Sequence, residues 1–585
     1  MKEAPVPSLS LTPFVRNEIV VLILTCTIRS ITTHHSPLMD CDEVYNYWEP
    51  LHFMLYGTGL QTWEYSPEFR LRTFAYLTPL AKIGEFLKFA GVEDKILLFT
   101  VLRSLLAGFT GYCEYYFAQG VAKIWGKDVG WLTLLLSLCS PGMFHSSGAL
   151  LPSATAMQLL LLSTGNLCQN PHNAALSIII GLMATLALGW PFCAVCWMPI
   201  GAYAVFQALD SDHLNGFKNV VHVLLRTTIH AVLIQTIVCV IDYQWYQTLT
   251  FPSLNIFMYN AAAGGDELYG IEPASYYLKN LALNFNLTLA FAIFAPFAML
   301  MNKSIGKKLS NACTSSNCPT GLRFSVLAPL ILWFLLIGLR PHKEERFVFP
   351  VYPLIVLAGA IGLEHMIQTA RLVWNLISQD REQSIHRGRI IFILRAAVLI
   401  ACSAISIFRM LALSNYYGAP VQLYTVLNQD IVFNDIDRTT VCVGGDWHRF
   451  PSSFFLPEGS HLAFLPSEFK GQLPQPFAPG GVAVKPLQPI NDMNREEVSR
   501  YVAGGISNCD YVVELMLTED RILGRNAPAT SLLMETDRKG RWNKIASFDF
   551  LDAENTHGFH RMLYIPRISV SQAALVDYAL WKRDA

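Results

Sequence analysis

The chain of 585 residues has little charge: Lys, Arg, Asp and Glu make up 15% of it, against about 25% in soluble globular proteins. Hydrophobic residues make up 52%, and the mean hydropathy is +0.34. A soluble protein of this composition would have too few charged side chains to cover its surface. The excess of apolar side chains therefore has to face lipid, in many segments of roughly 20 residues. The composition predicts a polytopic membrane protein and excludes a soluble enzyme.

The sequence also lacks a basic segment long enough to follow a phosphate backbone, and its formal net charge is -1. We therefore expect membrane lipid, and no nucleic acid, among its partners. Cys193 and Cys196 form a C-x-x-C pattern without a second pair of ligands, so we expect neither a redox nor a zinc site there. Most of the thirteen cysteines lie in apolar runs, where a cysteine is usually a small buried hydrophobe: Cys26, Cys139, Cys168, Cys193, Cys196, Cys239 and Cys402.

No internal repeat, low-complexity tract or cleavable signal peptide is evident. The apolar stretch from Glu18 to about Thr33 has no small-residue cleavage site after it, so we expect a retained first span. The main alternative from another functional class is a transporter, which would show paired, similar halves with broken helices. Because no such repeat is found, we favour an enzyme.

Apolar runs and prolines define the expected organisation of the membrane part. Seven apolar runs lie between residues 71 and 241, but an even number of spans is needed there, because both ends of this region are expected on the same side of the membrane. One run is therefore expected to be re-entrant or merged, either within 129–167, which Pro141 and Pro152 interrupt, or at the Gly189-Trp190-Pro191 kink. Residues 1–413 then form a membrane module of about eleven spans. Residues 414–585 have no such run and are expected to form a water-soluble domain of mixed α/β type. The apolar runs are 72–90, 97–120, 129–147, 149–167, 174–190, 191–208, 219–241, 281–301, 322–340, 347–368 and 390–413.

Two basic loops indicate the orientation. Residues 301–323 carry four Lys or Arg and no acid, and residues 371–389 are also basic. Positive charges mark cytoplasmic loops. The loop 34–70, the region 242–280, the turn 340–346 and the tail after residue 413 are then expected together on the opposite, non-cytosolic side.

The first of these far-side loops is rich in acids and aromatic rings. Carboxylates accept hydrogen bonds from sugar hydroxyls or remove a proton from one, while aromatic rings cover the apolar face of a pyranose. A solvated loop with an interfacial aromatic belt is the alternative, but it explains the gathered acids poorly. The candidate residues are Asp40, Asp42, Glu43, Trp48, Glu49, Trp63 and Glu64.

Asp40-Cys41-Asp42 also forms a D-x-D pattern, which many nucleotide-sugar transferases use to hold a divalent metal. The pattern is short, and it lies on the wrong side of the membrane for cytosolic nucleotide sugars. We therefore expect no metal and no cofactor, and we favour Asp42 as a general base. Asp40 and Glu43 remain as alternative bases.

A second candidate cluster lies at Arg340, His342, Lys343 and Arg346, between two spans on the same far side. Basic residues at this end of a span oppose the usual charge bias, and a bound phosphate would explain them. Internal pairing with Glu344 and Glu345 is the alternative. Further candidates for substrate binding are Arg103, which could also be a snorkelling anchor, Tyr259 and Glu272.

Several motifs resemble the family of dolichyl-phosphate-mannose-dependent alpha-1,2-mannosyltransferases that extend the lipid-linked N-glycan precursor. They are DCDEVYNYWEPLHF at 40–53, QTWEYSP at 61–67, GWPF at 189–192, YGIEP at 269–273, NFN at 284–286, RPHKEERFVFP at 340–350 and VCVGGDWHRFPSSFFLP at 441–457. The tail beyond about residue 470 carries no part of this resemblance.

The resemblance implies a GT-C type fold, with the catalytic acid in a lumenal first loop and a lumenal C-terminal domain in the endoplasmic reticulum. It further implies inverting transfer of mannose from dolichyl-phosphate mannose to a dolichyl-diphosphate oligomannose, at two separate steps and without a bound metal. Sister transferases that make another linkage or act on GPI precursors are the alternative. All of these expectations require the acidic loop and the cationic turn to converge on one site.

Overall fold

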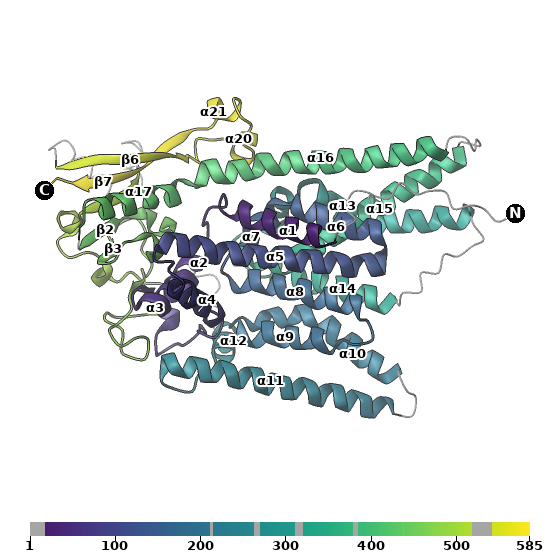
Figure 1. Ribbon diagram of the computed structural model, residues 1–585, viewed down its shortest axis with the longest axis horizontal. Coiled ribbons are helices and arrows are strands. Elements are labelled where there is room, and N and C mark those ends of the chain that lie inside the picture. Colours follow the sequence, from purple (N-terminus) through teal and green to yellow (C-terminus); the bar gives the residue numbers. More distant parts are fainter. Residues whose placement is uncertain are drawn as a thin grey trace.

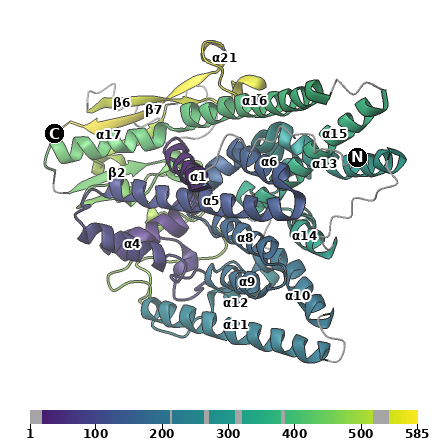
Figure 2. The same cartoon turned by 45° about the vertical axis from the view of Figure 1, so that its right-hand side comes forward.

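The computed structural model describes residues 18–210, 215–262, 270–309, 320–377, 384–436, 438–516 and 541–584. A bundle of long helices forms one part of the molecule, and a sheet domain built from the C-terminal residues covers one end of it (Figure 1). The short helices of the first loop lie at that same end, as the turned view also shows (Figure 2).

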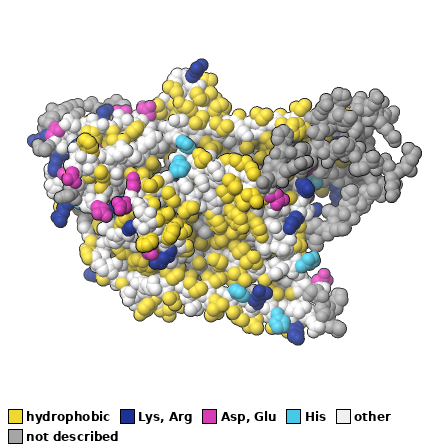
Figure 3. Space-filling model, in the orientation of Figure 1, with side chains coloured by type: hydrophobic (Ala, Val, Ile, Leu, Met, Phe, Trp, Pro, Cys, Tyr) yellow, Lys and Arg dark blue, Asp and Glu magenta, His cyan; other side chains and the backbone are white. Residues whose placement is uncertain are grey.

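Seven helical segments of the described residues are long and apolar enough to cross a membrane. Apolar side chains cover much of the face in Figure 3, and charged side chains and His lie mostly toward the two ends. The seven segments belong to α5 (Lys95–Trp125), η3 with α10 (Pro191–Trp197 and Met198–Asp210), α11 (Gly216–Tyr246), α13 (Tyr276–Leu309), α14 (Thr320–Ile337), η5 with α15 (Glu345–Val351 and Tyr352–Ile377) and α16 (Ser384–Tyr417).

Shorter helices complete the bundle, and prolines separate them as predicted. The region 129–167 divides into α6 (Lys127–Leu138), α7 (Pro141–Ser147) and α8 (Pro152–Gln169), and a proline begins both α7 and α8. Proline suits a first turn because its missing N–H has no partner there in any case. The expected Glu18–Thr33 helix is α1. At the predicted Gly189-Trp190-Pro191 kink, α9 (Ala175–Ala187) gives way to η3.

The apolar run at 72–90 does not form a span. Only Thr78–Phe89 is helical, as α4, and twelve residues are too few to cross a bilayer. The preceding residues are held in place by Asp242 of α11, whose carboxylate accepts hydrogen bonds from the Thr73 hydroxyl and from the backbone N–H of Phe74 at 2.7 Å. These bonds fix a non-helical segment at the end of the bundle that carries the first loop.

The described part of the C-terminal domain contains helix α17 (Ala419–Phe433) and a five-stranded sheet with the order β3-β2-β5-β7-β6. Strands β3 (Ser460–Phe464), β2 (Thr439–Val443) and β5 (Tyr511–Leu515) are parallel, whereas β7 (Leu575–Arg583) is antiparallel to β5 and to β6 (Trp542–Leu551). This arrangement agrees with the expected mixed α/β domain. The change in composition near residue 414 falls at the end of α16, which continues to Tyr417.

The sheet domain contains a disulfide, whereas the described cysteines of the helical bundle do not form one. Cys442 of β2 and Cys509, two residues before β5, form a disulfide inside the sheet domain. Nothing in the sequence pattern indicated this bond. Cys193 and Cys196 are buried and unpaired, as expected for small residues in an apolar segment.

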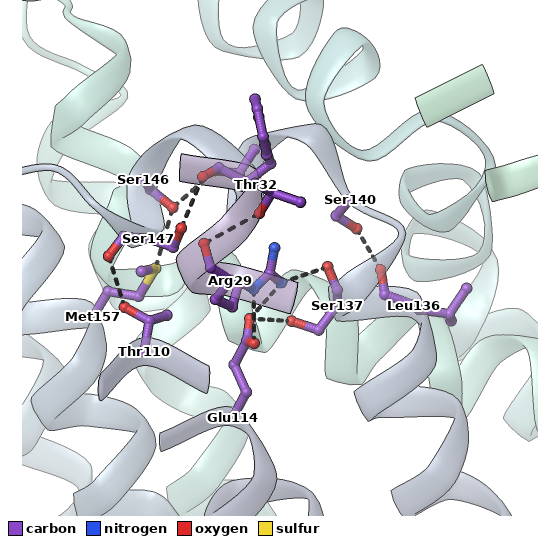
Figure 4. Close-up of polar contacts among 12 residues, drawn as sticks. Arg29, Thr32, Thr110, Glu114, Leu136, Ser137, Ser140, Ser146, Ser147 and Met157 are labelled. Carbon is purple, nitrogen blue, oxygen red and sulfur yellow. Dashed lines mark hydrogen bonds and ion pairs between the residues drawn. The ribbon is translucent and has the colours of Figure 1, made fainter. Parts of the chain in front are cut away.

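A buried ion pair joins α1, α5 and α6 within the bundle (Figure 4). Arg29 donates to both carboxylate oxygens of Glu114, at 2.9 and 2.6 Å, and to the Ser137 carbonyl at 2.9 Å. The Ser137 hydroxyl in turn donates to Glu114 at 2.7 Å. Both charged side chains are 1% exposed. Removal of one partner would therefore leave an uncompensated charge away from water.

We predict that Glu114→Ala lowers the free energy of unfolding by about 3–5 kcal/mol, measured by thermal unfolding in detergent. The double variant Arg29→Met with Glu114→Leu removes both charges and should recover most of that loss. Glu85→Gln is the matched control, because the Lys82–Glu85 pair is 69% and 50% exposed and should contribute no more than about 1 kcal/mol. Equal losses for Glu114→Ala and Glu85→Gln would contradict the prediction.

Candidate active site

A cavity of about 660 Å³ opens where the first loop, the turn after α14 and the C-terminal domain meet. The far-side regions that the sequence analysis grouped together therefore do share one end of the bundle. The charged lining residues come from the first loop, from Arg72 directly after it and from the turn: Asp40, Asp42, Glu64, Arg72, Arg340, His342, Glu344 and Arg346. Asn46 and Thr62 of the first loop also line the cavity.

Arg346 connects the acidic loop to the cationic turn. Its Nη1 lies 3.0 Å from Oδ1 of Asp40, and its Nη2 lies 2.5 Å from Oδ2 of Asp42. Glu344 forms an ion pair with the same guanidinium. The two clusters, about three hundred residues apart in the sequence, thus meet around one positive charge. The convergence required by the sequence analysis is confirmed.

Local structure presents the two aspartates side by side. Asp40 caps the single turn α2 (Cys41–Glu43), and its carboxylate accepts the backbone N–H of Asp42 at 2.9 Å. A π-helical turn, η1 (Val44–Trp48), follows directly and leads into α3 (Glu49–Tyr56). π-Helical turns are rare in proteins, and those that occur often lie at functional sites. The Asp40 and Asp42 side chains keep 28% and 35% of their surface exposed, toward the cavity that they line.

The two aspartates differ in their protonation equilibria. Burial raises the pKa of Asp40 to about 7, and the carboxylates of Asp42 and Glu344 add to the rise. Burial acts on Asp42 as well, but the positive charges of Arg346 and Arg72 outweigh it and lower the pKa of this carboxyl. The hydrogen bond to Glu344 raises the pKa of His342. Near neutral pH the site therefore holds Asp42 ionised, while Asp40 is close to its midpoint.

The predicted aromatic and acidic residues Trp63, Tyr259 and Glu64 also line the cavity. The ring centroids of Trp63 and Tyr259 lie 5.3 Å apart. Glu64 pairs with Arg72 at 2.8 Å. Arg72 donates to the Tyr47 hydroxyl at 2.6 Å. The sequence analysis missed Arg72, although a cation directly after an acid-rich loop is a signal that could have identified it.

Two predicted residues of the first loop, Glu43 and Trp48, do not line the cavity. The Glu43 carboxylate is buried and accepts hydrogen bonds from Nε1 of Trp48 at 2.9 Å and from the Leu150 N–H at 3.0 Å. Trp48 is fully buried in the hydrophobic core. Both residues hold the loop against the helices, so the alternative that Glu43 is the base has no geometric support.

Glu49 joins the first loop to the C-terminal domain instead of lining the cavity. Its carboxylate accepts the N–H and the hydroxyl of Ser453 at 2.5 and 2.8 Å, and the N–H of Leu60 at 2.8 Å. Beside it, β1 (Leu60–Gln61) pairs with β4 (Gln475–Pro476). Ser453 belongs to the PSSFFLP motif, which therefore serves to dock the two parts of the chain.

Three further predicted residues also bind protein groups outside the cavity lining. Arg103 donates to the Ser36 carbonyl at 2.8 Å, which anchors the start of the first loop. Lys343 donates to the carbonyls of Glu272 at 3.2 Å and Arg340 at 2.5 Å. Lys343 therefore fastens the cationic turn to the segment that follows α12 (Pro252–Ala262), and Glu272 contributes through its backbone.

Sequence reasoning missed the remaining walls of the cavity. Trp190, Phe192 and the end of α14 form an apolar wall on the membrane side, and the C-terminal domain supplies Trp447, Phe469, Gln472 and Asn494. Trp190, Phe192 and Trp447 lie in motifs that carried the family resemblance. Phe469, Gln472 and Asn494 lie at or beyond the point where the resemblance ends, so no motif indicated them.

Arg346 is the cation that contacts Asp40 and Asp42 in this structure. Both carboxylates of the D-x-D pattern are thus bound to this arginine. Among the residues that the structure describes, no three His, Cys, Asp or Glu side chains are grouped so that they could hold a metal ion.

An acid pair bound to an arginine shares one cavity with aromatic rings and an apolar wall, beside helices that are long and apolar enough to cross a membrane. This arrangement is typical of a membrane enzyme that transfers a group between lipid-linked substrates. The family comparison agrees with this class. A sequence model of the Alg9-like mannosyltransferase family matches residues 20–457, and the chain belongs to this family. The expected enzyme class and the expected GT-C type membrane fold with its C-terminal sheet domain are thereby confirmed.

Named relatives resemble nearly the whole chain. It is 36% identical to the alpha-1,2-mannosyltransferase ALG9 of Mus musculus over 557 residues, which covers 94% of this chain and 86% of that protein. It is 34% identical to the alpha-1,2-mannosyltransferase algn-9 of Caenorhabditis elegans, with 93% and 87% covered. Among solved structures, it is similar to apo ArnT from Cupriavidus metallidurans, with a TM-score of 0.49, 11% identity, and 86% and 93% covered.

We predict that Glu49→Ala lowers the free energy of unfolding. The substitution leaves the backbone N–H groups of Ser453 and Leu60 without an acceptor, and each should cost about 1–3 kcal/mol. Differential scanning fluorimetry in detergent measures the change. Glu93→Ala, at an exposed position near the start of α5, serves as control and should leave the unfolding temperature unchanged. A Glu49→Ala protein as stable as the parent would show that the bonds to Ser453 do not hold the C-terminal domain.

Proposed function

We propose that the chain transfers mannose from dolichyl-phosphate mannose to the 2-hydroxyl of a mannose on a dolichyl-diphosphate oligomannose. This is an alpha-1,2 linkage, made with inversion at two separate steps of N-glycan precursor assembly. The observation that carries the proposal is the sharing of Arg346 by Asp40 and Asp42 inside a cavity with an apolar wall. The names and near-complete coverage of the relatives support the choice of sugar and linkage.

The donor phosphate is assigned to the cationic turn. Arg346 and His342 line the cavity beside the end of α14, where Trp333, Leu336 and Ile337 offer an apolar wall to a prenyl chain. An arginine fork matches two phosphate oxygens. When the phosphate binds, Arg346 exchanges its carboxylate partners for phosphate oxygens, and the growing negative charge of the leaving group is stabilised there.

The same exchange activates the base. With its guanidinium partner drawn to the phosphate, the Asp42 carboxylate loses its strongest stabilising charge and becomes more basic. It then removes the proton of the acceptor 2-hydroxyl. The hydroxyl oxygen forms the new bond to the anomeric carbon of the donor, and the bond from that carbon to the phosphate oxygen breaks, its electron pair leaving with dolichyl phosphate. No metal or cofactor takes part.

The acceptor is assigned to the aromatic part of the lining. Trp63 and Tyr259 offer ring faces to the acceptor sugars, and Gln472 and Asn494 of the C-terminal domain offer amide groups to their hydroxyls. Docking of that domain through Glu49 and the β1–β4 pair brings these groups into the cavity that the acids also line.

The proposed location is the membrane of the endoplasmic reticulum, with the cavity on the lumenal side. The Cys442–Cys509 disulfide supports this location, because such bonds persist in oxidising compartments and are rare in the cytosol. The excess of Lys and Arg in the sequence at residues 301–323 and 371–389 supports the same orientation.

The decisive test is a transfer assay with purified protein, dolichyl-phosphate mannose and a dolichyl-diphosphate oligomannose acceptor. We expect one added hexose in alpha-1,2 linkage, and an unchanged rate in EDTA. Asp42→Asn should lower kcat by about 100- to 10,000-fold, as loss of a general base does, with an unchanged unfolding temperature. Glu68→Gln, an exposed acid of the same loop outside the cavity lining, should retain full activity.

Three outcomes would contradict parts of the proposal. A near-normal rate for Asp42→Asn would assign the base to Asp40. Inhibition by EDTA that manganese reverses would restore the D-x-D pattern as a metal site. Transfer to a GPI precursor, or another linkage, would identify a sister activity.

We predict that the KM for the donor rises with pH through about 7, because ionised Asp40 competes with the donor phosphate for Arg346. Burial raises the pKa of Asp40 to about 7, so the competing charge is absent below that pH and present above it. The kcat should stay flat through the titration of Asp40, because in the proposed mechanism Asp40 affects donor binding and takes no part in the transfer step. Steady-state kinetics at pH 6–8 measures both quantities.

Asp40→Asn provides the matched variant, because it removes the titrating group while its side-chain oxygen can still accept the Asp42 N–H. Its donor KM should be low and independent of pH. If instead kcat rises with pH through 7 and this rise disappears in Asp40→Asn, then Asp40 is the base.

A further inference from the structure

A second cavity lies at the opposite end of the helical bundle. Its volume is about 1390 Å³, above the range of roughly 300–1,000 Å³ usual for small-molecule sites. Helix α14 reaches from one cavity to the other. Leu322 in its first turn lines the second cavity, and Ile337, its last residue, lines the cavity of the candidate active site. These residues are fifteen positions apart, about 22 Å along a helix. The second cavity therefore faces the other leaflet of the membrane.

Helices that cross or enter the membrane form the walls of this cavity. Ile178 of α9, Phe206 of α10 and Phe324 of α14 are among its apolar lining residues, and α11 closes it along Val223 and Thr227. Helix α11 packs against α9 and α10, while side chains such as Leu224 and Leu225 are exposed. A ligand in this cavity would thus lie between helices whose outer faces are apolar, and it would contact apolar side chains on several sides.

The polar part of the cavity is cationic. Lys123 at the end of α5 and Arg226 of α11 line it together with His172, His222 and His230. Asp210 is the only acid among its described lining residues. Blue and cyan side chains gather near the ends of α10 and α11 in Figure 3. Cationic and imidazole N–H groups beside apolar walls are the complement of a phosphate headgroup attached to acyl chains.

The two cations are available for a ligand. Both Lys123 and Arg226 are exposed. Within the described part of the chain, neither side chain forms an ion pair or a hydrogen bond with another residue. A cation held beside apolar walls without a carboxylate partner favours an anion at that place. The proposed mannosyl transfer uses neither residue.

We propose that the second cavity binds one anionic phospholipid of the leaflet opposite the catalytic cavity. Its phosphate headgroup contacts Lys123, Arg226 and the neighbouring histidines, and its acyl chains lie between α9, α10, α11 and α14. The basic loops predicted for this end place it at the cytosolic leaflet, where anionic lipids are enriched. The bound lipid would join α11 to the rest of the bundle and stabilise it.

Thermal unfolding in detergent micelles, titrated with phosphatidylinositol, tests this proposal. We expect a saturable rise in the unfolding temperature. The double variant Lys123→Gln with Arg226→Gln should raise the half-saturating lipid fraction by about tenfold or more, because it removes two charge-assisted contacts. Arg226→Lys keeps the charge and should bind more tightly than Arg226→Gln. Both substituted positions are exposed, so the lipid-free unfolding temperature should stay that of the parent.

Lys218→Gln is the matched control, because Lys218 is an exposed cation on the same helix, eight residues before Arg226, and does not line the cavity. It should leave the titration unchanged. Equal stabilisation by zwitterionic phosphatidylcholine would overturn the proposed headgroup contact, and equal stabilisation by inorganic phosphate would indicate a site for a free anion. A double variant that responds like the parent would also overturn the proposal. None of these results depends on the outcome of the transfer assay.

Discussion

The active site depends on one arginine that is shared by two aspartates. Three carboxylates surround Arg346 in a partly enclosed cavity, where an unpaired charge of either sign would be costly. The empty site is therefore satisfied by internal ion pairs, and a phosphate that takes the guanidinium must release a carboxylate. In the proposed mechanism, this exchange couples donor binding to activation of the base.

The rest of the first loop serves to hold that arrangement in place. Glu43, Glu49 and Arg103 are charged residues of the loop and of α5, yet they bind backbone groups and a tryptophan rather than facing the cavity. Burial of a charge is tolerated here because each group has several hydrogen-bond partners. The acids of the loop thus differ in role: Asp40, Asp42 and Glu64 line the cavity, whereas Glu43 and Glu49 act as internal connections.

The two ends of the bundle carry different chemistry. One end has the sheet domain, the disulfide and a cavity in which acids and cations are balanced. The other end has a larger cavity with a cationic rim. Helices such as α14 reach from one cavity to the other, so a ligand at either end contacts the same scaffold. The two proposed ligands, a phospholipid at one end and a lipid-linked sugar at the other, would therefore both stabilise the bundle.

Composition, apolar runs and charge bias were sufficient to predict the class of membrane protein, the breaks at Pro141 and Pro152, and the common side of the acidic loop and the cationic turn. These properties are local, because hydropathy and proline act over one helix. The pairing of Arg346 with Asp40 and Asp42, the inward roles of Glu43, Glu49 and Lys343, the Cys442–Cys509 bond and the cavity wall at Gln472 and Asn494 were decided by tertiary structure. The sequence does not distinguish a carboxylate or ammonium group that binds a ligand from one that binds a backbone N–H or carbonyl group. Only the packing of distant segments determines which partner lies within hydrogen-bond distance.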